Sequence, residues 1–323
     1  MMGTGKSVVV GVSMAGQSEA ALIDCQGSIL RRCPIKMLRG RTIGATLDPY
    51  LRAIEEMLVL ARAGQWRVQG IAISLPGSVD EDARRPLSVP MLPALNGFPL
   101  CELLETRYTL PARLLVDVDA SLLGEYHFGA DQARDARRLL FLTVNAVVGA
   151  ALAVDGELAR PIHSCVGHVS HLLVAASGPR CSCGKRGCIN SLVSLDAMQK
   201  MVQRALQRGE ETTLARRLLD RAIGIPQIIA EEARRGDDVA TRIFGEVSRW
   251  LSAAMTQYIN LLEPDMIILG GETINAYDLL RGRDESAPTK AIHATLQPTS
   301  AIATRVEIIP ACLGRDAILL GLV

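Results

Sequence analysis

Three cysteines in a short loop are the residues of this sequence best suited to chemistry. Cys181, Cys183 and Cys188 lie in the stretch PRCSCGKRGCIN, whereas the other cysteines of the chain are scattered. Thiolates together with an imidazole typically form closed, tetrahedral zinc sites, and the glycines at 184 and 187 permit the sharp turns that such a loop needs. A chance cluster and a redox pair are the alternatives. The loop lacks the Cys-x-x-Cys spacing of redox motifs.

The fourth zinc ligand would come from the segment CVGHVSH, just upstream of the loop. His168 is the first candidate, and His171 competes with it. The loop is also rich in basic residues, which favour thiolates over thiols. The sequence therefore predicts a structural zinc ion with four ligands: His168, Cys181, Cys183 and Cys188.

The elements that must position this loop follow a repeating pattern. Apolar runs at 7–14, 68–77 and 112–119 predict strands. The apolar residues of 47–64 recur every three or four positions and predict a helix that ends at Gly64. Strands that alternate with helices indicate an α/β fold with parallel pairs of strands.

A second cycle of the same kind follows in the other half of the chain. The segment 138–159 again predicts two strands joined by a turn, and AALAVDG at 150–156 is similar to AALIDCQG at 20–27. Further helices are predicted at 191–208, 225–236 and 238–264, and a further strand at 265–272. We therefore predict two similar α/β lobes, a smaller one at 1–120 and a larger one at 121–323 that carries the cysteine loop.

Composition narrows the classes of function. The 323 residues are 49% hydrophobic and include 35 basic and 34 acidic side chains, for a net charge of +1. This balance creates no overall field that would draw the protein to nucleic acid or to a membrane. No apolar run is long enough to cross a bilayer, and the start of the chain lacks the features of a signal peptide. We therefore expect a cytoplasmic protein without disulfides.

Several motifs together resemble the ROK family of sugar kinases and sugar-responsive transcriptional repressors, over nearly the whole chain. The cysteine loop is the most specific of them, since it is similar to the family's C-x-C-G-x-x-G-C-x-E stretch. GIAISLPGSVD, LNGFPLCELLE and LLEPDMIILGGE are similar to three further family motifs. The resemblance implies a two-lobe, actin-like α/β fold (ribonuclease H-like, as in sugar kinases) with sugar and ATP between the lobes. It also implies dimers or tetramers.

The resemblance places a general base at Asp117, where ROK kinases carry the aspartate of an N-D-x-N loop at the end of a strand. Such a base would take the proton from a sugar hydroxyl, with ATP and a magnesium ion supplying the phosphoryl group. The flanking positions depart from the family pattern, because Val116 and Asp119 stand where asparagines are usual. The alternative is that Asp117 only caps the helix that follows it.

Both phosphate-binding turns of the family lack, in this sequence, the residues that bind phosphate. The D-x-G-G-T-K turn becomes SMAGQS at 13–18, and the G-T-G-x-G turn becomes NAVVG at 145–149. Glycines let backbone N–H groups approach phosphate closely, so valines at the second turn crowd the phosphate oxygens. These changes argue against ATP binding.

The sugar side of the site is also altered. Two glutamates that bind sugar hydroxyls in the family are replaced by Cys165 and Asn190, and an asparagine is replaced by Met91. Asn190 retains a carbonyl oxygen and an amide that can form hydrogen bonds. The resemblance therefore leaves four candidate ligand-binding residues: Gly77, Asp117, His168 and Asn190.

These observations favour a sugar-sensing transcriptional regulator that is inactive as a kinase and binds a sugar or a sugar phosphate. Repressors of the family read DNA through an N-terminal winged helix-turn-helix, which this sequence does not show. We therefore expect DNA contact only through such a missing domain or through a partner. The alternative is an ATP-dependent kinase of a hexose or amino sugar with Asp117 as base. A third reading is a degenerate homologue that serves only in oligomerisation.

Overall fold

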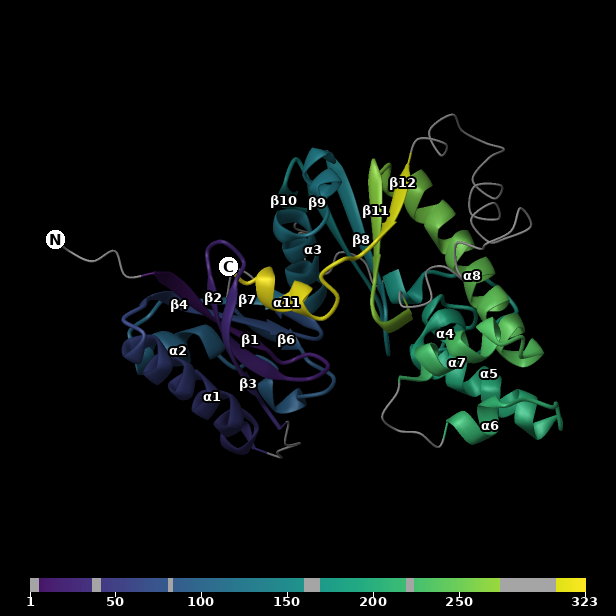
Figure 1. The fold of residues 1–323 in the computed structure, drawn as a ribbon, viewed down its shortest axis with the longest axis horizontal. Coiled ribbons are helices and arrows are strands. Elements are labelled where there is room, and N and C mark those ends of the chain that lie inside the picture. Colours follow the sequence, from purple (N-terminus) through teal and green to yellow (C-terminus); the bar gives the residue numbers. More distant parts are fainter. Residues whose placement is uncertain (1–5, 37–41, 81–83, 160–168, 219–223, 274–305) are drawn as a thin grey trace. The chain divides into compact units, whose positions relative to one another are not determined.

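The computed structural model describes residues 6–36, 42–80, 84–159, 169–218, 224–273 and 306–323 (Figure 1). The chain divides into two compact units. Unit 1 comprises Met1–Asp135, Gly156–Val166 and Cys312–Val323, and unit 2 comprises Ala136–Asp155 and Gly167–Ala311. The boundary expected at residue 120 lies inside a helix of unit 1, and the C-terminal segment also belongs to that unit.

Unit 1 is built on a five-stranded sheet of order β3-β2-β1-β4-β7. Its strands are β1 (Ser7–Ser13), β2 (Glu19–Asp24), β3 (Ile29–Pro34), β4 (Arg67–Leu75) and β7 (Ala112–Val116). The hairpin strands β1, β2 and β3 pair antiparallel, whereas β1, β4 and β7 run parallel. Val10 in the centre of β1 thus faces Leu22 on one side and Ile71 on the other. The predicted parallel α/β arrangement is confirmed.

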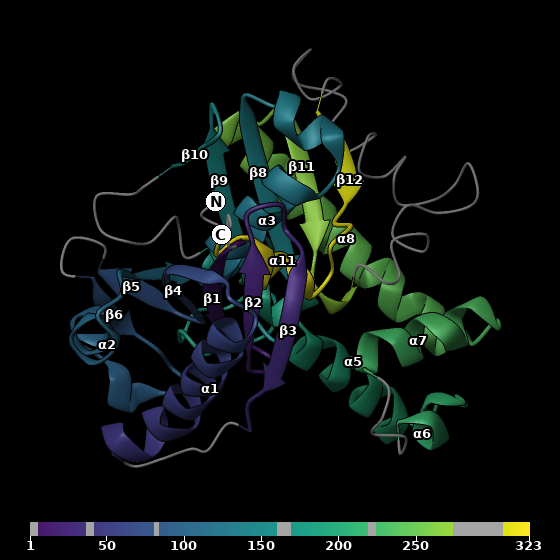
Figure 2. The same ribbon diagram turned by 60° about the vertical axis from the view of Figure 1, so that its left-hand side comes forward.

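Helices cover both faces of this sheet (Figures 1 and 2). One face packs against α1 (Ile43–Ala63) and α2 (Leu100–Tyr108), and the other against α3 (Asp117–Phe128) and α11 (Asp316–Leu320). The predicted end of α1 at Gly64 is confirmed, but the helix begins earlier than the apolar pattern indicated. Thr42 caps it, because its side chain accepts a hydrogen bond from the N–H of Ala45.

A close crossing joins α3 to the C-terminal segment of the chain. A methyl group on Gly124 would lie 2.1 Å from the carbonyl oxygen of Ala317, so only glycine fits there. Glu125 is fully buried beside it and accepts hydrogen bonds from the N–H groups of Cys312 (3.1 Å) and Leu313 (2.9 Å). These contacts make the last residues of the chain part of the unit 1 core.

Smaller elements complete the course of unit 1. They are β5 (Ser78–Asp80), β6 (Arg85–Ser88), η1 (Pro93–Leu95) and η2 (Asp131–Asp135). The strands β5 and β6 form a separate two-stranded hairpin that follows strand β4.

The second sheet has the order β10-β9-β8-β11-β12. Its strands are β8 (Arg138–Val144), β9 (Val148–Val154), β10 (Glu157–Leu158), β11 (Met266–Gly270) and β12 (Glu307–Pro310). The hairpin β8–β9 is antiparallel, and β8, β11 and β12 are parallel. The order repeats that of the first sheet, and the two similar Ala-Ala-Leu stretches lie on the matching strands β2 and β9. The short sequence repeat therefore reflects a repeated topology.

Unit 2 otherwise consists mainly of helices. They are α4 (Asn190–Val193), α5 (Leu195–Gln207), α6 (Leu214–Arg217), α7 (Ile225–Arg234), α8 (Asp238–Leu262) and the 3-10 helix η3 (Val169–His171). The single helix predicted over 191–208 is divided at Ser194, whose backbone is extended and whose side chain caps α5 by accepting from the N–H of Ala197. A serine that bonds the backbone in this way favours a new helix start over continuation.

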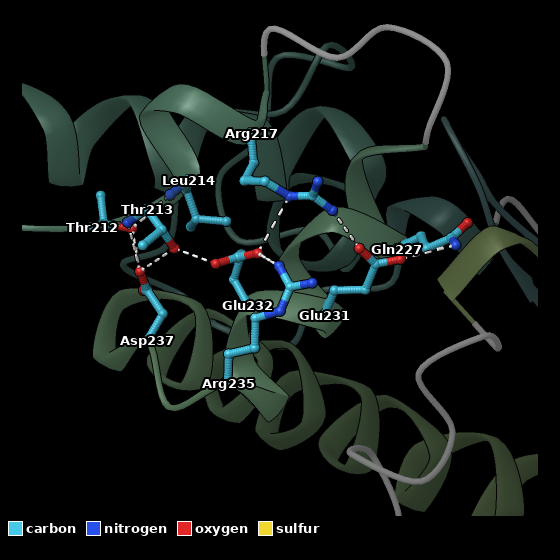
Figure 3. A network of polar contacts seen from close by, with 9 residues as sticks. All are labelled: Thr212, Thr213, Leu214, Arg217, Gln227, Glu231, Glu232, Arg235 and Asp237. Atoms are coloured by element: carbon cyan, nitrogen blue, oxygen red, sulfur yellow. Dashed lines mark hydrogen bonds and ion pairs between the residues drawn. The ribbon is translucent and has the colours of Figure 1, made fainter.

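A polar network holds α6, α7 and the start of α8 together (Figure 3). The carboxylate of Glu232 is buried and accepts a hydrogen bond from the Thr213 hydroxyl, while Arg217 and Arg235 pair with it. The hydrogen bond from Thr213 and the two guanidinium groups hold the pKa of Glu232 below its ordinary value. The buried charge is therefore compensated within unit 2.

Among the residues that the structure describes, no helix combines the length and the apolar character needed to cross a membrane.

Candidate functional site

The cysteine loop and η3 bring four metal-ligating side chains together. The ligand atoms of His171, Cys181, Cys183 and Cys188 all lie within 4.8 Å of one another. Cys183 Sγ and Cys188 Sγ are 3.6 Å apart, and Cys181 Sγ lies 3.4 Å from His171 Nδ1. A tetrahedral zinc ion would hold two sulfur ligands about 3.8 Å apart, and a sulfur and a nitrogen about 3.5 Å apart. The cluster therefore fits a structural zinc ion.

The backbone of the loop fixes these side chains. The N–H of Cys181 donates to the carbonyl of Lys185 at 2.8 Å, which closes the turn that carries Cys183. Gly187 has a φ of +71°, and a methyl group there would lie only 1.5 Å from the carbonyl oxygen of Ala175. The second glycine of the loop is thus required by close packing as well as by its backbone conformation.

The thiols of the loop differ in their acidity. A hydrogen bond from the backbone N–H of Lys185 is the main cause that lowers the pKa of Cys183. Burial, together with the neighbouring Cys183 and Cys181, raises the pKa of Cys188 to about 12. Metal ligation requires thiolates, so binding of a cation here would release protons.

The sequence left two candidates for the histidine ligand, His168 and His171. His171, the second candidate, belongs to the cluster and ends η3. His168 and Cys165 lie outside the described residues, so the roles expected for them stay predictions.

Asp117 and Gly77 lie at the same end of neighbouring parallel strands in unit 1. Leu75 of β4 pairs with Val116 of β7, and each candidate residue follows within two positions. Asp117 begins α3, and its carboxylate accepts a hydrogen bond from the N–H of Val118 at 2.9 Å. Burial raises the pKa of Asp117 to about 6. A carboxyl with such a pKa is able to exchange protons near neutral pH.

Gly77 has a structural requirement of its own. Its φ is +142°, and a methyl group would lie 2.0 Å from the carbonyl oxygen of Ser88 on the neighbouring hairpin. Glycine is therefore needed here whether or not a ligand binds.

Asn190 does not simply replace a sugar-binding carboxylate. It begins α4 directly after the cysteine loop, and its Oδ1 atom accepts a hydrogen bond from the N–H of Val148 at 3.0 Å. Val148 starts β9, so the hydrogen bond ties the cysteine loop to the β8–β9 turn. The side-chain carbonyl oxygen of Asn190 therefore already accepts a hydrogen bond within unit 2.

The first hairpin turn of unit 1 is engaged in a similar way. The side chain of Met14 is fully buried, and its N–H donates to the carbonyl of Ser74 at 2.9 Å. The Ser18 hydroxyl lies 3.2 Å from the hydroxyl of Tyr50, which is also buried. This turn is thus held by contacts to its own sheet and to α1.

From the sequence, Asn145 was only the first residue of an altered phosphate turn, whereas the fold makes it a central residue of unit 2. Its side chain bonds Thr143 and the backbone of Glu272, and its backbone carbonyl accepts from Leu195 at the start of α5. A polar residue at the first position of a turn was the available signal, but a turn asparagine ordinarily bonds only its own local backbone.

The two repeated sheets, each with a hairpin followed by parallel strands, define the two-lobe actin-like class of fold, and the Cys3His cluster adds a distinctive loop to it. The chain belongs to the ROK family, whose model matches residues 9–323. It is 26% identical to the glucokinase of Thermotoga maritima over 283 residues, which cover 86% of each chain. It is equally 26% identical to the DNA-binding transcriptional repressor Mlc of Escherichia coli over 281 residues, 85% of this chain and 67% of Mlc.

Solved structures give the same two kinds of relative. The chain matches a ROK-family transcriptional regulator, described as a homologue of E. coli Mlc, with a TM-score of 0.85 and 25% identity, over 98% of this chain and 77% of that one. It matches a ROK glucokinase from Streptomyces griseus, solved with glucose and AMPPNP, with a TM-score of 0.78 and 25% identity, over 98% and 97% of the chains. Kinases and repressors are therefore both among its relatives at about the same identity.

Proposed function

We propose that this protein is a sugar-responsive transcriptional regulator whose ROK fold no longer transfers phosphate. The proposal is carried by the state of the two hairpin turns. In each turn an N–H group is already donated to a protein oxygen atom, that of Met14 to Ser74 and that of Val148 to Asn190. A phosphate group bound at such turns needs free amide donors and close approach. Val147, which is 57% exposed at the tip of the second turn, adds bulk there.

In this proposal the effector is a sugar or a sugar phosphate, and four residues form the ligand-binding set: Gly77, Asp117, His168 and Asn190. Because the Oδ1 atom of Asn190 is bonded to Val148, its amide nitrogen is the group left to contact a ligand. A zinc ion held by the three cysteines and a histidine would fix the loop that ends at Asn190. Such an ion supplies folding energy and takes no part in chemistry.

Two measurements on the purified chain test the proposal. We expect about one zinc ion per chain by elemental analysis. Mg-AMPPNP should leave the melting temperature unchanged, whereas one member of a panel of sugars and sugar phosphates should raise it, because a ligand that binds only the folded state stabilises that state. Sugar-dependent release of ADP would contradict the proposal. The proposal would also be contradicted if no compound of the panel shifted the melting temperature. The remaining function would then be that of an oligomerisation module.

The kinase alternative rests on one specific observation, the position and acidity of Asp117. Asp117 directly follows strand β7 and is the first residue of α3, and burial raises the pKa of its carboxyl to about 6. An ATP-dependent hexose or amino-sugar kinase would use it as general base. The matched variant Asp117→Asn keeps the size of the side chain and removes the base. ADP release that this variant abolishes would support the kinase.

The partners in this proposal are DNA, reached through an N-terminal winged helix-turn-helix or through a partner protein, and further copies of the chain in a dimer or tetramer. The DNA sequence directly upstream of the coding region tests the first part, since an in-frame helix-turn-helix there would support it. Light scattering of the purified chain tests the second part, and a monomer would contradict it.

A further inference from the structure

Asn145 uses all four of its polar groups to join separate segments of unit 2. Its side-chain amide donates to Thr143 Oγ1 at 3.0 Å, and its Oδ1 atom accepts from the N–H of Glu272 at 2.8 Å. Its backbone carbonyl accepts from the N–H of Leu195 at 3.0 Å, and its own N–H donates to Val147 within the turn at 3.3 Å. One residue of the β8–β9 turn therefore holds both the start of α5 and the turn that follows β11.

Asn190 extends this set of hydrogen bonds to the cysteine loop. It lies two positions after Cys188, and it accepts the N–H of Val148 at the other end of the same β8–β9 turn. The cysteine loop, the β8–β9 turn and the turn after β11 are thus connected in series through two asparagine side chains.

The turn after β11 is tightly packed against the end of β8. A methyl group on Gly271 would lie 2.5 Å from the carbonyl oxygen of Val144 and 2.8 Å from Thr143 Oγ1. The Thr273 hydroxyl also donates to the Val144 carbonyl at 3.2 Å. The turn after β11 thus packs closely on Thr143 and Val144, the two residues that precede Asn145, so a displacement of this end of β8 together with Asn145 leaves the turn no free space.

We propose that Asn190 and Asn145 are positioning residues that transmit the metal state of the cysteine loop to the β8–β9 turn and to the turn after β11. With the cysteine loop closed on its metal, Asn190 holds Val148 in place, and Asn145 holds Glu272. When the metal is lost, Asn190 is released and both turns loosen together. The two turns of unit 2 then respond as one element to the occupancy of a site that neither of them contributes to.

Hydrogen exchange on the zinc-loaded full chain, read at single amides, tests this proposal. In Asn190→Ala the amide of Val148 should exchange about fivefold faster, the loss expected for one hydrogen bond of ordinary strength. Asn190→Asp keeps the acceptor oxygen and should restore the slow exchange. Ser191→Ala is the matched control, because the Ser191 hydroxyl donates to the carbonyls of Pro179 and Cys188 within the loop, and its loss should leave Val148 unchanged.

Removal of the metal with a chelator supplies the second readout. In the wild-type chain, chelation should speed exchange at both Val148 and Glu272. In Asn190→Ala it should add nothing further at either amide, because the connection is already broken. In Asn145→Ala it should still act on Val148 but no longer on Glu272. Equal responses to the chelator in the wild-type chain and in Asn190→Ala would overturn the proposal, as would wild-type exchange of Val148 in Asn190→Ala.

The proposal depends on the metal site and not on sugar sensing, and metal content separates the two. A chain that takes up no zinc when zinc is supplied overturns both the metal site and the coupling. A chain that holds zinc and fails the exchange test overturns the coupling alone. The sugar-dependent shift in melting temperature is independent of both results.

Discussion

The substitution Asp117→Asn should make the protein more stable at neutral pH. Burial raises the pKa of this carboxyl from its ordinary 3.8 to about 6. The folded state therefore binds a proton more tightly than the unfolded state, and folding loses stability as the pH rises through the interval between the two values. A shift of roughly two units corresponds to about 3 kcal/mol at about 1.4 kcal/mol per unit. Solvent screening of this partly exposed side chain reduces the penalty to about 1–2 kcal/mol.

Thermal or urea unfolding at two pH values measures this penalty. Asparagine keeps an oxygen that can accept from Val118 and carries no charge, so at pH 7.5 the variant should melt higher by about 2–4 °C for each kcal/mol. At pH 4.5 the advantage should fall to about a third, because the folded carboxyl is then largely protonated. A variant that is less stable than the wild type at pH 7.5 would refute the reasoning. An advantage that does not change with pH would refute it equally.

Three further predictions concern single buried contacts. Glu125→Ala should destabilise unit 1 by about 2–4 kcal/mol in urea unfolding, since two backbone N–H groups lose their acceptor; a change below about 0.5 kcal/mol would contradict this. Gly187→Ala should lower the zinc content of the purified chain, because its methyl group meets the Ala175 carbonyl, whereas Gly184→Ala, which shares the positive φ (+88°) but meets no atom within 4 Å, should lower it less. Glu232→Gln should cost about 1–3 kcal/mol at pH 7. That cost should shrink as the pH falls below about 4.5, because Glu232, whose pKa is lowered in the folded state, stabilises the fold only while its carboxylate is ionised.

Regular patterns in the sequence predicted most of the fold. The strands were recognisable as apolar runs because the sheet is covered on both faces, and the helix that ends at Gly64 was recognisable because its apolar side packs on that sheet. The start of that helix and the division of the helix at Ser194 were missed, because both depend on a single side chain that caps the backbone. The C-terminal residues belong to unit 1 because of contacts between segments far apart in the chain. No local sequence pattern predicts such contacts.

The candidate site was predicted less evenly. The cysteine spacing predicted three candidate ligands because a chelating loop needs them close in sequence. The sequence left the histidine open between His168 and His171, which both lie just upstream of the loop, and the structure places His171 in the cluster. The hydrogen bond of Asn190 could not be predicted, because its partner Val148 is 42 positions away and is a backbone group without a sequence signature. For the same reason Asn145 was read only as the first residue of an altered turn.

The place of the C-terminal segment in unit 1 has a consequence for synthesis of the chain. Leu319, Leu320 and Leu322 complete a core of that unit, together with Ala21 and Ile23 of β2. During translation these leucines emerge after the strands of the sheet, so until then α3 covers that face of the sheet without them. Unit 2, whose residues all precede Cys312, is complete earlier. The sheet of unit 1 is therefore made before unit 2 and completed after it, and during that interval its incompletely covered face is a target for chaperones.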